Sequence, residues 1–228
     1  MDVILRFRKN KVAVIGDLRE MFLQIALPEE DRAFHKFLWH NKETDETEIH
    51  QFKVHCFGNR SSPAVAIFTV KHHAEVNKDK FPRAAETVLK STIVDDNVDS
   101  VDTKEEAEKL IADLKELYNG AGMQIRKWAS NNKDILDNLP QEDLATNVVF
   151  SYDFEPNSAM HKIKALGIIW LAEKDEFSFL ADIDPNQVWT KRSILSAASR
   201  LFDPLGLISP IAISARIVVQ GCWRHKFD

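Results

Sequence analysis

Three aspartates stand at positions where their carboxylates could bind a divalent cation. Asp17 ends the short apolar run 12–16, and Asp95 and Asp96 follow another apolar pair at 93–94. Adjacent carboxylates repel each other, so a positive charge should stabilise them. Mg²⁺ prefers a few carboxylates together with phosphate oxygens and water. Two such ions about 3.5–4 Å apart would activate an attacking hydroxyl and stabilise a leaving phosphate oxygen.

Two other interpretations of these acids stay open on the residues alone. In the first, Asp17 is a helix N-cap and residues 95–97 form a polar turn. In the second, residues 95–106 form an EF-hand-like calcium loop, although Ser100 occupies the sixth position, which requires glycine. The segment before this loop also favours a strand, where an EF-hand needs a helix. The loop would take its ligands from Asp95, Asn97, Asp99 and Glu106.

The elements that would position the acids can be inferred from apolar periodicity, caps and turn residues. Strands and helices alternate with a hairpin at the second acidic site, which predicts an α+β fold with helices packed on one face of an antiparallel sheet. In chain order, the sequence predicts a strand at 11–17, a helix at 18–25, strands at 34–40 and 48–57, helices at 61–76 and 82–90, a hairpin at 91–101, a helix at 103–118, strands at 123–128, 165–171 and 177–180, and a helix at 190–202.

Composition and charge describe an ordinary globular chain of 228 residues with a formal net charge of -5. Bulk charge therefore does not indicate a nucleic-acid binder, and positive charge would have to be local.

A compositional change near residues 182–188 predicts two units, 1–181 and 182–228. The apolar stretch 205–223 contains Pro210 and Arg216, which favours a buried helix or loop over a membrane span. Two distant cysteines fit a reduced intracellular protein.

Several segments in order resemble the motifs of reverse transcriptases, most closely those of the BEL/Pao class of LTR retrotransposons. The similarity spans nearly the whole chain, and its weight comes from the order and spacing of the motifs. They are Val-Ala-Val-Ile-Gly-Asp-Leu-Arg-Glu-Met-Phe-Leu-Gln-Ile at 12–25, Phe-Gly-Asn-Arg-Ser-Ser-Pro at 57–63, Val-Asp-Asp at 94–96, Gly-Met-Gln-Ile-Arg-Lys-Trp-Ala-Ser-Asn at 122–131, Leu-Gly-Ile-Ile-Trp at 166–170, and Thr-Lys-Arg-Ser-Ile-Leu-Ser with Leu-Phe-Asp-Pro-Leu-Gly within 190–206.

This resemblance implies RNA- or DNA-templated DNA synthesis. It implies a reverse-transcriptase palm with a remnant of the fingers at 1–181 and a truncated helical segment like a thumb or connection at 182–228. Asp17 and Asp95 would bind two Mg²⁺ ions, for which Mn²⁺ could substitute, and Asp96 would support them. The primer 3′-hydroxyl would attack the dNTP α-phosphate in line, so catalysis would consist mostly of positioning and charge neutralisation.

The resemblance also implies roles for further residues. Phe22 matches the bulky gate that excludes a ribose 2′-hydroxyl, and as a residue it is equally a core aromatic. Phe57 and Gly58 would lie near the incoming nucleotide. Lys127 matches the lysine that assists the pyrophosphate leaving group, and as a residue it is equally a surface lysine. Leu166 and Gly167 would belong to the primer grip, and the template-primer backbone would contact Lys191, Arg192 and Arg200.

The chain departs from the family pattern in two places. Ile93 replaces the usual aromatic before Val-Asp-Asp, and the basic fingers region before Asp17 is almost absent. The expected partners are an RNA or DNA template-primer and dNTP, with no membrane, and the expected location is intracellular, in the cytoplasm or a virus-like particle. The family's protease, RNase H and integrase are expected to lie outside this chain. The alternative function is a catalytically inactive remnant that keeps the fold or binds nucleic acid only.

Overall fold

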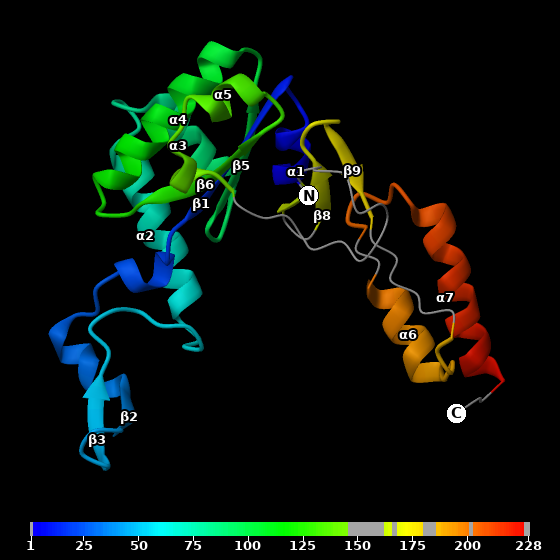
Figure 1. Cartoon of the computed structure of the whole chain (residues 1–228), viewed down its shortest axis with the longest axis horizontal. Coiled ribbons are helices and arrows are strands. Elements are labelled where there is room, and N and C mark those ends of the chain that lie inside the picture. The colour runs from blue at the N-terminus through cyan, green and yellow to red at the C-terminus, as the bar shows by residue number, and fades with distance from the viewer. Residues whose placement is uncertain (1, 146–161, 166–167, 180–185, 201–202, 226–228) are drawn as a thin grey trace. The chain divides into compact units, whose positions relative to one another are not determined.

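The chain divides into two compact units, Asp2–Leu144 and Ala145–Asp228. The computed structural model describes residues 2–145, 162–165, 168–179, 186–200 and 203–225 (Figure 1). The division predicted after residue 181 falls on residues 180–185, which lie outside the described residues.

A four-stranded antiparallel sheet forms the centre of the first unit, with strand order β4-β5-β1-β6. The helices between the strands give the chain order β-α-β-β-α-β, which is a ferredoxin-like arrangement. The predicted α+β class with an antiparallel sheet is therefore confirmed. The strands are β1 (Val12–Leu18), β4 (Thr92–Ile93), β5 (Asp96–Val101) and β6 (Ile125–Ser130).

Three helices cover one face of this sheet: α2 (Ser62–Val76), α3 (Pro82–Lys90) and α4 (Lys104–Asn119) (Figure 1). Both α2 and α3 have proline in the first turn, where a missing N–H costs nothing. A capping box begins α4, at the start of the helix predicted at 103–118. Glu106 N donates to Thr103 Oγ1 at 3.2 Å, and Thr103 N donates to Glu106 Oε2 at 3.3 Å. Local sequence signals thus determine where these helices begin.

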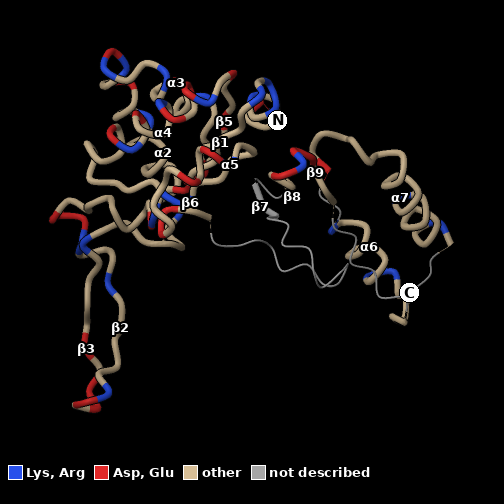
Figure 2. The backbone as a smooth tube through the Cα atoms, turned by 45° about the horizontal axis from the view of Figure 1, so that its top comes forward, with Lys and Arg blue, Asp and Glu red and all other residues tan. Residues whose placement is uncertain are grey.

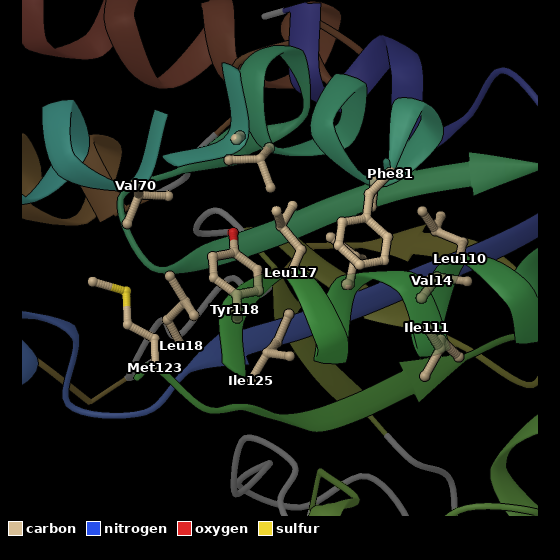
Figure 3. Packing of buried hydrophobic residues seen from close by; sticks show 14 of the residues in the cluster. Val14, Leu18, Val70, Phe81, Leu110, Ile111, Leu117, Tyr118, Met123 and Ile125 are labelled. Atoms are coloured by element: carbon tan, nitrogen blue, oxygen red, sulfur yellow. The ribbon is translucent and has the colours of Figure 1, made fainter. Parts of the chain in front are cut away.

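The core of the first unit lies between these helices and the sheet (Figure 3). Val14, Leu18 and Ile125 come from the strands, and they meet the apolar face of α4, including Leu110 and Leu117. The amphipathic pattern that predicted a helix at 103–118 therefore also identified which face is buried.

One short helix lies on the other face of the sheet, which the sequence did not predict. Helix α1 (Asp2–Phe7) contacts β5, and Ser100 Oγ donates to the Arg6 carbonyl at 2.6 Å. Both faces of β1 and β5 are consequently buried along most of their length. A strand that is buried on both faces lacks the alternation of apolar and polar residues that identifies a strand with one buried face in a sequence.

A β-hairpin extends away from this sheet (Figures 1 and 2). It consists of β2 (Lys36–Asn41) and β3 (Glu46–Gln51), close to the predicted strands at 34–40 and 48–57. The predicted helix at 18–25 is wrong in part. Strand β1 continues to Leu18, whose N–H donates to the Asp95 carbonyl, and the 3₁₀ helices η1 (Met21–Gln24) and η2 (Glu29–Phe34) follow.

The remaining elements of the first unit follow β6 in the chain and contact it. Helix α5 (Lys133–Asp137) and the 3₁₀ helix η3 (Gln141–Asp143) follow that strand. An isolated bridge joins Trp128 to Leu144. Trp128 is almost fully buried and packs over Gly16 of β1, where a Cβ would come within 2.8 Å of the indole ring. Glycine is needed here because the side chains of Trp128 and Ile125 on β6 leave no room for a methyl group.

The second unit contains a three-stranded antiparallel meander and two helices. The meander consists of β7 (Lys162–Ala165), β8 (Ile168–Leu171) and β9 (Glu176–Ser178). Helix α6 (Lys191–Arg200) begins after Thr190, whose hydroxyl accepts from Ser193 N at 3.2 Å, as the sequence predicted. Asp203 then accepts from the N–H groups of Leu207 and Ile208 at 2.9 Å each, before α7 (Ser209–Arg224).

The stretch 205–223 was expected to be buried, and this is wrong for the part that the structure describes. Helix α7 contains no buried residue, and Ile211 and Ile217 are exposed. Helix α6 packs along α7, and one neighbouring helix covers only one stripe of such a surface. Within the described residues, no helix has the length and apolar character needed to cross a bilayer.

Replacing Gly16 by alanine should destabilise the first unit, because the added methyl group would press against Trp128 and Ile125. Overpacking of this kind costs about 1–3 kcal/mol. Urea unfolding of the purified chain measures the loss. Gly221→Ala is the matched control, because a Cβ there meets nothing within 4 Å, and it should be neutral or slightly stabilising in a helix. Equal stability of the Gly16 variant and the wild type would contradict the close packing.

Candidate active site

The structure brings Asp17, Asp95 and Asp96 together at one end of β1 and β5. Asp17 and Asp96 are direct cross-strand partners in the antiparallel register. Asp95 lies in the two-residue turn between β4 and β5, since Ile93 pairs with Asp96 across it. The backbone joins the turn to the end of β1, because Leu18 N donates to the Asp95 carbonyl at 2.9 Å.

The carboxylates of Asp17 and Asp96 project from the face opposite α3 and α4. Asn97 and Asp99 on the same strand bond to groups of those helices, and side chains alternate along a strand. Asp96 therefore points away from the helices, as does its partner Asp17. The Asp17 side chain is 21% exposed, so the site is partly shielded and still open to solvent.

Burial and the charges of two neighbouring acids both act on Asp96. Burial, and then the nearby carboxylates of Asp95 and Asp17, raise the pKa of Asp96 from 3.8 to about 6. The ammonium of Lys127 acts in the opposite direction and lowers it. Like charges directly opposite each other in a sheet are destabilising, so the site has a surplus of negative charge that a cation would relieve.

Lys127 reaches this site because of a β-bulge in β6. Ile15 pairs with Ala129 and Asp17 with Arg126, so two residues of β6 lie opposite Gly16 alone. Lys127 has a φ of 55°, in the left-handed region, and a bulge of this kind re-aims a side chain. Its Nζ lies 2.9 Å from Asp17 Oδ1. Neither expectation for this residue, a lysine at the nucleotide or a surface lysine, included an ion pair with Asp17.

The turn that holds Asp95 contains a strained residue that the sequence analysis did not identify. Val94 has a φ of 57°, which is a genuine outlier for a β-branched side chain. Such strain costs on the order of 1–3 kcal/mol and gathers at functional sites. A signal was present in the sequence, because a two-residue hairpin turn normally uses Asn, Asp or Gly at the position that Val94 occupies.

The donor set suits a hard divalent cation, although its oxygens do not converge on one point. Three carboxylates, from β1, the β4–β5 turn and β5, are the ligand type that Mg²⁺ prefers. Over the described ranges, no group of three or more His, Cys, Asp or Glu side chains is placed to hold a metal ion. The Asp17 carboxylate is paired with an ammonium instead. The residues thus fit the ion by chemistry and charge, and binding would require Asp17 to exchange its partner.

The EF-hand interpretation is wrong. Asn97 and Asp99 lie in strand β5, and their side chains are already hydrogen-bonded inside the fold. Asp99 Oδ2 accepts from Arg83 Nη1 at 2.8 Å and from Thr87 Oγ1 at 2.7 Å. Asn97 Oδ1 accepts from Tyr118 Oη at 2.8 Å. Glu106, the expected twelfth ligand, belongs to the capping box of α4.

The structure also brings together the two aromatic residues predicted at the nucleotide. The rings of Phe22 and Phe57 meet edge to face with their centroids 4.8 Å apart. Phe22 is buried in the core, whereas Phe57 is 72% exposed. Gly58 has a φ of 94° with open space beside it. Phe22 is therefore a core aromatic, and Phe57 offers an exposed ring at the same place.

The remaining predicted residues belong to the second unit. The Lys191 Nζ lies 4.8 Å from the centroid of the Trp223 ring, which ties α6 to α7. Arg192 and Arg200 are exposed residues of α6. Leu166 and Gly167 lie outside the described residues.

The stability of the protein should fall as pH rises from about 4 to about 6, and Asp96→Asn should remove this fall. Because folding raises the pKa of Asp96, its contribution is fully present below pH 3.8 and is lost as pH rises through the folded pKa. The loss is on the order of 3 kcal/mol. Urea midpoints measured between pH 4 and 7 test this. Asp137→Asn, the same charge change at an exposed residue, should leave the pH dependence as in the wild type. Parallel curves for wild type and Asp96→Asn would count against a raised pKa.

Comparison with known proteins gives a match at the C-terminal end of the chain. Residues 190–228 match the family described as "Pao retrotransposon-like RNaseH-like domain". No curated protein matches the chain. The matched family is RNaseH-like, which is at odds with the expectation that every RNase H-type segment lies outside this chain. The match covers α6 and α7 but none of the three aspartates.

Proposed function

We propose that the first unit is the palm of a reverse transcriptase from a Pao-type retrotransposon polyprotein, and that it performs RNA-directed DNA synthesis. The observation that supports this most directly is the meeting of Asp17 with Asp95 and Asp96. One acid in a hairpin turn, a second at the start of the strand that follows it and a third at the end of the neighbouring strand are the arrangement expected of a two-metal nucleotidyl-transfer site. Burial, and after it the neighbouring carboxylates, raise the pKa of Asp96, and a cation would stabilise the ionised acids.

Asp17 and Asp95 would hold the ions through their carboxylates, with Asp96 in support. When bound, two Mg²⁺ ions, or Mn²⁺ in their place, would activate the primer 3′-hydroxyl and neutralise charge on the transferred phosphoryl group. The chain's own contribution is to fix the carboxylates. The register of β1 with β5 and the hydrogen bond from Leu18 N to the Asp95 carbonyl hold the two backbones in place.

The incoming dNTP would lie against Phe57. An exposed aromatic ring offers stacking area for a base or sugar, and the buried ring of Phe22 supports it at 4.8 Å between centroids. In this proposal the open, left-handed backbone at Gly58 lets the nucleotide approach closely. Phe22, which packs against Phe57, would exclude a hydroxyl group at the 2′ position of the nucleotide's sugar.

The C-terminal match favours nucleic-acid processing and bears less on the chemistry of the site. A segment of an RNaseH-like domain fits a polyprotein fragment that handles RNA and DNA, and such domains generally use divalent metals. Residues 190–228 contain two acids, Asp203 and Asp228. The Asp203 carboxylate accepts two backbone N–H groups, and Asp228 lies outside the described residues. A nuclease centre built from this segment alone is therefore not the function we propose. Lys191, Arg192 and Arg200 would instead contact the template-primer backbone.

Extension of a labelled DNA primer on an RNA template tests the proposal. The purified chain should incorporate dNTP in Mg²⁺ or Mn²⁺, and Asp95→Asn should lower the rate by at least about a hundredfold, as expected for loss of a group that stabilises transition-state charge. Asp137→Asn, an exposed residue of α5, is the charge-matched control and should retain the wild-type rate.

The outcomes separate the two candidate functions. No incorporation with either metal would remove the polymerase activity. Salt-dependent binding of the template-primer that is unchanged by Asp95→Asn would then favour a remnant that binds nucleic acid only. Incorporation that survives Asp95→Asn would show that the carboxylates assigned here are the wrong ones.

A further inference from the structure

We propose that Lys127 is a built-in competitor of the divalent cation, which occupies Asp17 in the metal-free protein and must release it before the cation binds. This inference rests on the proposed function, because it concerns the same carboxylates. It assigns Lys127 a role in the metal-free protein that is separate from any contact with the nucleotide. The bulge in β6 and the exposure of Lys127 and Asp17 support this role.

The backbone places Lys127 beside Asp17 independently of any ligand. The bulge opposite Gly16 puts an extra residue into β6, and Lys127 adopts the left-handed conformation there. A non-glycine residue at positive φ is uncommon and persists where its surroundings hold it. The ammonium then lies 2.9 Å from Asp17 Oδ1, which is the distance of a charge-assisted hydrogen bond.

This ion pair engages the one acid that the neighbouring strand contributes. Asp17 is the acid contributed by β1, while Asp95 and Asp96 come from the turn and from β5. As long as Asp17 is held by Lys127, a cation at the turn lacks the ligand from the neighbouring strand. Among the described side chains, no group of three is placed to hold a metal ion.

The pair is weak enough to be exchanged. The Lys127 side chain is 56% exposed and that of Asp17 is 21% exposed, so water can replace either partner. Exposed pairs contribute about 0–1 kcal/mol. Lysine has a flexible four-carbon stem and a strongly hydrated ammonium, which favours rapid departure. A doubly charged ion interacts more favourably with Asp17 and its two neighbouring carboxylates than a single ammonium does. The cation therefore displaces Lys127, but its binding free energy is reduced by the cost of breaking this ion pair.

The chain contains a matched pair for comparison. Lys115 Nζ lies 2.9 Å from Asp143 Oδ2, with both side chains 28% exposed. Lys115 belongs to α4, and its ammonium lies 6.0 Å from the ring of Trp128, which packs on the helix-covered face. Neutralising Lys115 removes one ammonium, as neutralising Lys127 does, but on the face of the sheet away from Asp17.

Binding of Mn²⁺ alone, followed by electron paramagnetic resonance on the full chain, measures the competition. Lys127→Met should bind Mn²⁺ on the order of tenfold more tightly than the wild type, because a unit charge beside a divalent ion at about 4 Å opposes binding even in water. Lys127→Arg keeps the charge and should stay near the wild type. Lys115→Met should also stay near the wild type. Circular dichroism confirms that each variant is folded.

The results distinguish this inference from the function on which it rests. If the wild type binds Mn²⁺ in a manner that Asp95→Asn abolishes, and Lys127→Met binds equally or more weakly, the competitor role is overturned while the metal site stands. If neither the wild type nor Lys127→Met binds Mn²⁺, both fail. Tighter binding by Lys127→Met together with tighter binding by Lys115→Met would indicate a general charge effect and would also overturn the role.

A second measurement avoids any substitution. The rate at which an amine-reactive acetylating reagent modifies Lys127 in the wild type, followed by mass spectrometry, should rise several-fold when Mg²⁺ is added, because the cation frees the ammonium from Asp17. Lys115 serves as the internal reference and should react at an unchanged rate. An unchanged rate at Lys127 in Mg²⁺ concentrations that saturate the site would refute the exchange.

Discussion

The candidate site depends on one unfavourable interaction, the direct opposition of Asp17 and Asp96 across two antiparallel strands. The register of β1 with β5 fixes this pairing, and a slip by one residue would turn both side chains to the other face. Like charges in this position destabilise a sheet. They persist because the rest of the register is specified by buried apolar residues on both faces, which a local repulsion cannot overcome.

Strand β5 separates two kinds of aspartate by the alternation of its side chains. Asp99 points toward the helices, where Arg83, Thr87 and the Ser100 N–H satisfy its carboxylate. A buried carboxylate with these partners is a structural group. Asp96 points the other way, where its neighbours are further carboxylates and one lysine. The roles of Asp96 and Asp99 are distinguished by the groups that surround each carboxylate, and not by burial or charge alone.

Two irregularities in the backbone complete the site. The bulge in β6 aims Lys127 at Asp17, and the tight turn at Val94 carries Asp95 to the end of β1. Both residues adopt left-handed conformations that their side chains disfavour. The cost is local, and it is offset by the regular hydrogen bonding of β1 with β5 and β6 on either side.

The sequence by itself determined the helices with strong local signals, the hairpin at 91–101 and the positions of the three acids. Caps, prolines and a 3.6-residue period are short-range features, so α4 and the capping box around Thr103 could be predicted from them. Only the tertiary structure decided which residue neutralises Asp17 and which acids are structural. Asp17 and Lys127 are distant in sequence, and the bulge that joins them follows from strand pairing and from the packing of Trp128 over Gly16. Such long-range pairing leaves no periodic signal in the sequence, because it arises only when the strands are assembled.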